Sequence, residues 1–181
     1  PLKIIWSSRV SKEKRILPFL ESIKQSKYHK NIQLTVIGEG NQLQEAKAFA
    51  KTNLTDTRIT FLGLVPHEEL FQYEKDQHLS IINSYGFDTQ GMTILEAIAC
   101  GLPVIYADPA MDENIPDQCG LRAKNNTPNA MAELLDYIFE NPELIKTMSK
   151  AALKASPSVM QSAQIKKLLN LYQSISSESH P

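Results

Sequence analysis

Short runs of apolar residues alternate along this chain with longer stretches that have helical periodicity. The apolar runs fall at residues 2–7, 33–38, 59–62, 79–83, 104–107 and 120–123, and the helical patterns between them cover about residues 12–26, 41–51, 68–75 and 89–100. This alternation predicts an α/β fold, a Rossmann-like doubly wound parallel sheet with helices on both faces. Because the runs are too uniformly apolar for half-exposed strands, we expect both faces of every strand to be covered.

The last third of the chain has helical patterns. Thr127 and Asn141 each precede a proline, so each is expected to cap a helix that has proline at its first position. A third helix is expected over about residues 158–175, and the polar residues 176–181 are expected to form a frayed, disordered tail. The sequence therefore predicts one domain, residues 1–175. It enters a buried strand at once and without an initiator methionine, which indicates a piece of a longer protein.

Composition restricts the class of protein. The 181 residues suffice for one domain with a real core. A formal net charge of -1 gives no basic field for a nucleic acid partner. No apolar run approaches the roughly 20 residues that span a bilayer, and no signal peptide opens the chain, so a soluble cytoplasmic protein is expected. The two cysteines, Cys100 and Cys119, are expected to be reduced core thiols.

The most informative segment, residues 88–96, reads DTQGMTILE. It follows a buried strand and opens a helix, so it lies at the carboxyl edge of the sheet, where open α/β sheets bind ligands. Gly91 allows a ligand to approach the backbone closely, and the first amides of a helix are unpaired donors at the positive end of its dipole. A phosphate fits such a helix start.

Two carboxylates flank this helix start. Glu96 lies about 7.5 Å beyond Gly91 at about 1.5 Å per helical residue, where it can accept hydrogen bonds from both ribose hydroxyls of a nucleotide. It is the single charge in residues 92–100, whose pattern predicts a largely buried helix, so it needs a partner. Asp88 can accept hydrogen bonds from sugar hydroxyls, or serve only as the N-cap of the helix.

A basic segment, SSRVSKEKR at residues 7–15, leaves the first strand at the same edge. Arg9 and Lys14 are placed to reach a diphosphate from this loop and to stabilise it as a leaving group in a metal-free site. The alternative is an exposed basic helix start in which Lys12 and Arg15 are simply solvated.

Two further turns give weaker signals. Residues 38–40 read GEG, but a dinucleotide fingerprint requires another glycine where Leu43 stands, so we expect a tight turn with Gly38 near a ligand. After the third strand, Leu64 and Val65 either offer backbone groups to a base or belong to a plain loop.

The histidines show no metal-ligand spacing, and no cysteine–histidine cluster or Ser-His-Asp arrangement stands out. His67, beside two glutamates, is expected only to begin a helix. Neither a metal nor a cofactor is therefore predicted.

Taken in order, these segments resemble the C-terminal domain of the large retaining glycosyltransferase family four, which has the GT-B fold, and the resemblance covers nearly the whole chain. Residues 8–14 resemble the family's G-R-x-x-x-x-K segment, with Ser8 in place of glycine. Residues 34–40 resemble its V-G-x-G turn, and residues 61–65 its F-x-G-x-V loop. Residues 88–104 resemble its most specific block, two glutamates with seven residues between them and then E-A-x-A-x-G-x-P-V.

The resemblance implies a role for each site residue. Glu96 would bind the ribose, and Arg9 and Lys14 would bind the diphosphate. The backbone of Gly91 and Met92 would approach a phosphate, and Asp88 would contact the donor sugar. Aspartate stands at position 88 where the family has glutamate. The Thr-Gln-Gly of residues 89–91 resembles bacterial members that glucosylate diacylglycerol or cell-surface polymers.

The resemblance also implies a function. Residues 1–175 would be the nucleotide-sugar binding half of a GT-B fold, in a metal-independent, retaining hexosyltransferase. The donor would be a UDP-sugar or another nucleotide sugar, and the acceptor a glycan, a lipid or a cell-surface polymer. The family places the acceptor site on an N-terminal domain that this chain lacks. We therefore expect the chain to bind nucleotide and to transfer no sugar alone. The missing half could contact a membrane, so the inner face of the membrane is an alternative location for the whole protein.

Other interpretations remain open. Two are enzymes of GT-B type, a sugar-nucleotide epimerase and a phosphorylase, although no pyridoxal-phosphate lysine site is evident for the latter. A third is a non-catalytic nucleotide-sensing module. An NAD-binding Rossmann domain is disfavoured by Leu43.

Overall fold

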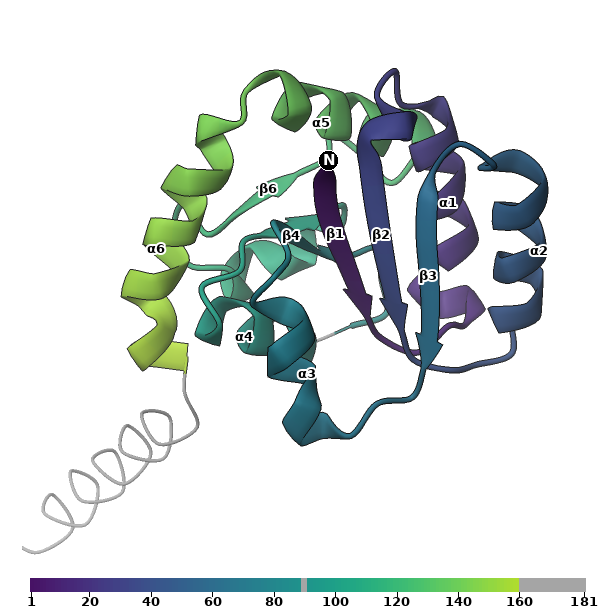
Figure 1. The fold of residues 1–181 in the computed structure, drawn as a ribbon. Helices are drawn as coiled ribbons and strands as arrows, with labels where there is room; N and C mark the ends of the chain where they lie inside the picture. Colours follow the sequence, from purple (N-terminus) through teal and green to yellow (C-terminus); the bar gives the residue numbers. More distant parts are fainter. Residues whose placement is uncertain (89–90, 160–181) are drawn as a thin grey trace, which may run out of the picture.

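The computed structural model of the chain describes residues 1–88 and 91–159. Its strands, all parallel, lie in the order β3-β2-β1-β4-β5-β6 (Figure 1). They are β1 (Leu2–Ser7), β2 (Ile32–Ile37), β3 (Arg58–Gly63), β4 (Leu79–Ile82), β5 (Val104–Tyr106) and β6 (Gly120–Arg122). The doubly wound parallel sheet predicted from the sequence is confirmed.

Helices cover the two faces of this sheet (Figure 1). On one face lie α1 (Ile16–Gln25), α2 (Leu43–Asn53) and α5 (Pro128–Glu140). On the other lie α3 (His67–Glu74) and α4 (Met92–Ala99), with α6 (Glu143–Val159) packed against α4. A hydrophobic core lies on each face of the sheet, and successive residues of β1 contribute to both because the side chains of a strand alternate between faces. Trp6 packs with Phe19 of α1, and Ile5 belongs to the cluster that contains Ile98 of α4.

The strand order creates a crevice at the carboxyl ends of β1 and β4. These strands are neighbours, but the chain leaves β1 for α1 on one face and leaves β4 for α4 on the other. The loops that follow them therefore diverge, and ligands bind at such a switch point in open α/β sheets. The loop after β1 contains residues 8–14 and the loop after β4 contains Asp88, so both carry segments that the sequence singled out.

The prediction that every strand is covered on both faces was wrong for the edge strands. Residues of β3 alternate between exposed and half-buried, and Leu62 is 39% exposed. In β6 the residues are half-buried or exposed. Ile59 and Phe61 of β3 pack against the cluster of α1 and α2, whereas the alternate residues of the strand point to the other face of the sheet and are exposed.

The continuous helix predicted over residues 12–26 was also wrong. A 3-10 turn, η1 (Lys12–Lys14), ends at Arg15, which adopts a left-handed backbone conformation with φ 63° before α1 begins. The Arg15 carbonyl accepts a hydrogen bond from the Asn83 amide at 2.8 Å, and its guanidinium donates to the Asn126 carbonyl at 2.5 Å. Tertiary contacts thus hold Arg15 in this conformation, and it is not simply solvated.

At the C-terminal end, the predicted start of a new helix at residue 158 was wrong, because α6 continues through Pro157 to Val159. Outside the described residues lie the rest of that predicted helix and the tail at 176–181. The same holds for Thr89 and Gln90. Thr127 caps α5 as predicted, accepting a hydrogen bond from the Ala130 amide at 3.2 Å. Asn141 instead donates its side-chain amide to the last turn of α5. No helix in the described part of the chain is long and apolar enough to span a bilayer.

Two further 3-10 segments complete the described elements. These are η2 (His29–Asn31), which leads into β2, and η3 (Pro109–Asn114), which follows β5.

Candidate nucleotide-sugar site

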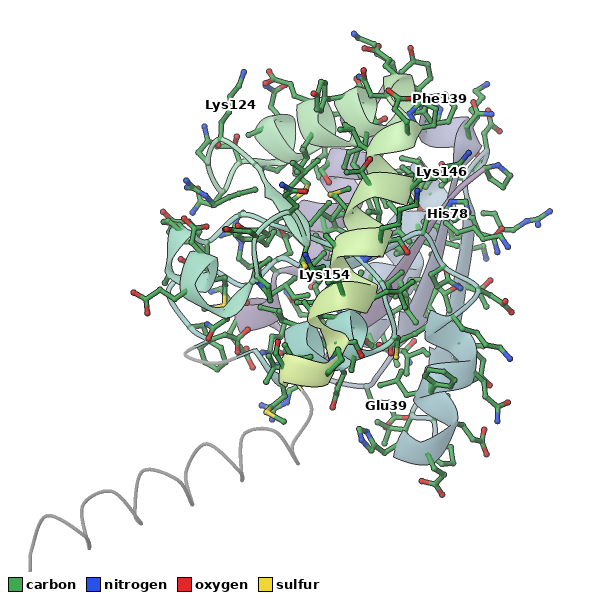
Figure 2. The ribbon with its side chains drawn as sticks, turned by 90° about the vertical axis from the view of Figure 1, so that its left-hand side faces the viewer. Glu39, His78, Lys124, Phe139, Lys146 and Lys154 are labelled. Atoms are coloured by element: carbon green, nitrogen blue, oxygen red, sulfur yellow. The ribbon has the colours of Figure 1, made fainter. Side chains whose placement is uncertain are left out.

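The site residues predicted from the sequence gather at the edge of the sheet where the strands end. Arg9 and Lys14 follow β1, Gly38 follows β2, Leu64 and Val65 follow β3, and residues 88–96 follow β4. In Figure 1 the arrows of β1, β2 and β3 point to the lower end of the molecule, and Figure 2 shows Glu39, which follows β2, at that same end.

A pocket of about 310 Å³, here called the edge pocket, opens beside the first three of these loops. It is lined by Ser7, Ser8, Arg9, Ile37, Gly38, Glu39, Leu64, Val65, His67 and Leu70. Four of the predicted residues therefore line one pocket, whereas Glu96, Gly91 and Met92 are not among its lining residues. His67 was expected only to begin a helix, yet it lines the pocket, because a helix start that follows a strand end lies at the same sheet edge.

The glycines of the turn after β2 are required by chain packing. Gly38 has φ 130°, and a Cβ built there would collide with the carbonyl oxygen of Ser8, while one built on Gly40 would collide with that of Val10. The two loops are joined by hydrogen bonds, including one from the Val10 amide to the Glu39 carbonyl at 2.9 Å. Gly38 does line the edge pocket, but its missing side chain makes room for the β1 loop.

Lys14 and Asp88 meet across the switch point. Lys14 Nζ lies 2.5 Å from Asp88 Oδ1, and the two side chains are only 21% and 16% exposed. Asp88 Oδ2 accepts a hydrogen bond from the buried Ser84 hydroxyl, and Lys14 lies 5.3 Å from the centroid of the Phe87 ring. Both charged residues line a small hollow that shares Ser8 with the edge pocket. The two cavities are therefore adjacent.

The N-cap role considered for Asp88 was wrong. Gly91 occupies the N-cap position of α4, and no side chain caps this helix. A Cβ built on Gly91 would lie 3.0 Å from Cδ1 of Ile94, so its absence makes room within α4's own first turn. Met92, the first residue of α4, is 63% exposed. Within this first turn the Ile94 amide donates a hydrogen bond to the Gly91 carbonyl at 2.8 Å, and Thr93 lines the small hollow.

Glu96 lies one turn further along α4. Its side chain is 28% exposed, less buried than the sequence pattern predicted. The ribose expected as its partner stays a prediction, and in the structure Nε2 of His67 lies 3.9 Å from Glu96 Oε1. Because His67 also lines the edge pocket, it connects Glu96 to that pocket.

Asp108 positions the loop that carries Asp88. It is 4% exposed and accepts hydrogen bonds from the Gly86 amide at 2.6 Å and the Ala110 amide at 3.0 Å. Asp108 was not among the residues predicted from the sequence, although a carboxylate directly after a buried strand and before a proline was a usable signal.

The edge therefore presents the cations Arg9 and Lys14 and the carboxylate of Asp88 around adjacent cavities, and Thr93 of the first turn of α4 lines the smaller one. This combination suits an anionic ligand that also carries hydroxyl groups. Within residues 1–88 and 91–159, no group of three or more histidine, cysteine or acidic side chains is arranged to hold a metal ion.

A larger hollow of about 750 Å³ lies away from these residues, between α6 and the segment before β6. Lys150 and Lys154 border it, and Lys154 is labelled on α6 in Figure 2. None of the predicted site residues lines this hollow.

The chain is similar to known proteins in sequence and in fold. The family model described as "Glycosyl transferases group 1" matches residues 1–155. The alpha-monoglucosyldiacylglycerol synthase of Acholeplasma laidlawii is 29% identical over 154 residues, which cover 82% of this chain and 37% of that protein. The chain thus spans little more than a third of this relative.

Two solved structures share the fold. Anabaena HepE in complex with UDP-glucose superposes with a TM-score of 0.80 at 18% identity, covering 97% of this chain and 49% of that one. The C-terminal domain of a Francisella tularensis glycosyl transferase group 1 family protein, LpcC, superposes with a TM-score of 0.72 at 20% identity, covering 87% and 85%.

Proposed function

The chain belongs to the group 1 glycosyl transferases, and on that premise we propose that it is the donor-binding domain of a retaining, metal-independent glycosyltransferase that uses a UDP-sugar. The observation that carries this proposal is the convergence of Arg9, Lys14 and the start of α4 on the switch point between β1 and β4. Basic side chains and free helix amides together favour a diphosphate.

The edge pocket would hold the nucleoside. It combines apolar walls from Leu64, Val65 and Leu70 with polar groups, which suits a base and a ribose. The backbone of Leu64 and Val65 would contact the base, and Glu96 would accept hydrogen bonds from the ribose hydroxyls. His67 lies between the pocket and Glu96 and supports this placement.

The diphosphate would lie between the nucleoside and the small hollow. Arg9 lines the edge pocket and Lys14 lines the hollow, so the two cations flank the path from one to the other. Both would neutralise the nucleoside diphosphate as it leaves the sugar, in place of a metal ion. Asp88, beside Lys14, would contact the donor sugar, and the backbone at Gly91 and Met92 would contact phosphate.

The choice of donor and acceptor draws on the relatives. HepE is described in complex with UDP-glucose, which supports a UDP-sugar. The name of the Acholeplasma relative supports a lipid acceptor and a place in glycolipid synthesis. Because this chain spans 37% of that relative, we propose that a further domain of the whole protein carries the acceptor site and any membrane contact at the cytoplasmic face. The chain alone would bind the donor and transfer no sugar.

Ligand-dependent stabilisation tests the proposal. The melting temperature of the chain is measured with UDP, GDP, ADP and NAD, since a ligand that binds only the folded state at about 100 times its Kd stabilises it by about 2.7 kcal/mol. We expect the largest rise with UDP, and its loss in Glu96→Gln and Arg9→Ala.

Two variants serve as matched controls. Glu45→Gln on α2 and Arg58→Ala at the start of β3 change exposed residues of the same types away from the site, and both should keep the UDP response. A rise with NAD and none with any nucleoside diphosphate would overturn the proposal in favour of a dinucleotide-binding domain.

A further inference from the structure

Helix α3 forms one wall of the edge pocket, through His67 and Leu70, although most of the helix is exposed. Glu74 is its one buried residue, with 1% of its surface exposed. Leu70 and Tyr73 are partly buried against the apolar cluster that contains residues of α4. A fully buried glutamate is rare unless it has a partner, so the burial of Glu74 calls for a role.

Two polar contacts join α3 to α4. The thiol of Cys100, just after α4, donates a hydrogen bond to Glu74 Oε2 at 3.0 Å. One turn earlier on α4, Glu96 lies 3.9 Å from His67, at the other end of α3. Both contacts depend on how α3 lies against α4, and the second one involves His67, which lines the edge pocket.

The C-terminal end of α4 is itself fixed by α6. The Ser156 hydroxyl donates to the Ala99 carbonyl at 2.8 Å, and the Ser149 hydroxyl donates to the Gly101 carbonyl at 2.9 Å. These two bonds flank Cys100 on both sides. The thiol therefore lies between two carbonyls that α6 holds, and Glu74 is the residue of α3 that accepts a hydrogen bond from it.

We propose that Glu74 is a positioning residue for the donor site, which acts through Cys100 to hold α3 against α4 and so keeps His67 and the pocket wall in place beside Glu96. This inference rests on the proposed function of the edge pocket. Glu74 does not line that pocket and is assigned no contact with the ligand.

The buried position of Glu74 disfavours its charged form. Burial, and then the nearby negative charge of Glu96, raise the pKa of the Glu74 carboxyl, while the Cys100 hydrogen bond and His67 act in the opposite direction. Burial and the contact with Glu74 raise the pKa of the Cys100 thiol to about 12, so the thiol keeps its proton. Glu74 Oε1 is buried with no hydrogen-bond partner among the described residues. An ionised Glu74 would therefore be poorly stabilised where it lies.

The direction of the pH effect follows. Because the folded-state pKa of Glu74 lies above its ordinary value of 4.5, the folded chain binds more protons than the unfolded chain between these two values. Stability therefore falls as pH rises across that window. Above the folded-state pKa, Glu74 ionises beside Glu96 and favours release of α3 from α4. The affinity for nucleotide then falls by up to about tenfold per pH unit.

The test compares the wild-type chain with Glu74→Gln, whose amide has the same shape, can still accept from Cys100 and cannot ionise. UDP affinity is measured by calorimetry from about pH 5 to about pH 9, and unfolding by urea is measured without ligand over the same range. We expect the two proteins to bind alike at low pH, and Glu74→Gln to keep affinity and stability where the wild type loses them.

Two further variants complete the comparison. Glu69→Gln, an exposed glutamate on the same helix, is the matched control and should follow the wild-type profile. Cys100→Ala removes the donor and should weaken UDP binding at every pH while leaving the chain folded.

The outcomes are distinct. UDP binding with the same pH profile in the wild type and Glu74→Gln overturns the positioning role and leaves the proposed function standing. No UDP binding by the wild type at any pH overturns the proposed function and this inference with it.

Discussion

Replacing Asp88 by asparagine tests the central charge pair of the site. In the free chain, Lys14 Nζ lies 2.5 Å from Asp88 Oδ1, with 21% and 16% of the two side chains exposed. The cation proposed to bind the diphosphate is thus already neutralised by a carboxylate. Asparagine keeps the size of the side chain and its capacity to accept a hydrogen bond from Ser84, but removes the charge.

The magnitude follows from the burial of the pair. An exposed ion pair contributes about 0–1 kcal/mol, whereas removing one partner of a fully buried pair costs about 3–5 kcal/mol. With roughly four-fifths of both side chains shielded, we expect a loss of about 2 kcal/mol in the free energy of unfolding. For a chain of this length that corresponds to a fall of about 4–8 °C in Tm.

The same change should strengthen binding of UDP. Without Asp88, Lys14 no longer divides its charge between a carboxylate and the diphosphate, and we expect about tenfold tighter binding, equivalent to about 1.4 kcal/mol. The preference for UDP-glucose over UDP should fall, because the proposed sugar contact is lost. Lys14→Met should instead weaken binding of both ligands.

Thermal unfolding and calorimetry with UDP and UDP-glucose measure these effects. The matched control is Asp56→Asn, which breaks the exposed pair between Asp56 and Lys30 at 2.9 Å and should leave both Tm and UDP affinity near the wild-type values. An Asp88→Asn chain with unchanged Tm and weaker UDP binding would refute the idea that Asp88 holds Lys14 and competes with the diphosphate.

Two further predictions concern the loops that shape the site. Gly38→Ala places a Cβ against the Ser8 carbonyl at φ 130°, so we expect the free energy of unfolding, measured with urea, to fall by at least about 1–3 kcal/mol. An unchanged urea midpoint would show that the loops after β1 and β2 can separate freely. Asp108→Ala leaves the Gly86 amide without its acceptor at 2.6 Å, so we expect the free energy of unfolding to fall by about 1–3 kcal/mol and calorimetry to show weaker binding of UDP-glucose. Full stability with normal binding would mean that Asp108 does not hold this loop.

The sequence by itself determined the order of the elements and the edge at which the site lies. Strands buried on both faces must be apolar, and parallel strands need crossover helices, so the alternation of patterns specified a doubly wound sheet. The ends of parallel strands meet at one edge, which is why Arg9, Gly38 and Leu64, far apart in the sequence, could be placed together in advance. The resemblance of the segments 8–14 and 88–104 to one family added the ligand class.

The tertiary structure alone decided which side chains pair. The local pattern of residues 12–26 favours one helix, yet the contacts of Arg15 with Asn83 and Asn126 break it with a left-handed residue. Nothing near Asp88 in sequence indicates that its partner is Lys14. Glu74 lies in a polar helix and is buried only because Cys100 and the end of α4 lie beside it. Periodicity reports the average environment of a face, whereas the burial and partner of one side chain depend on groups that packing brings from elsewhere in the chain.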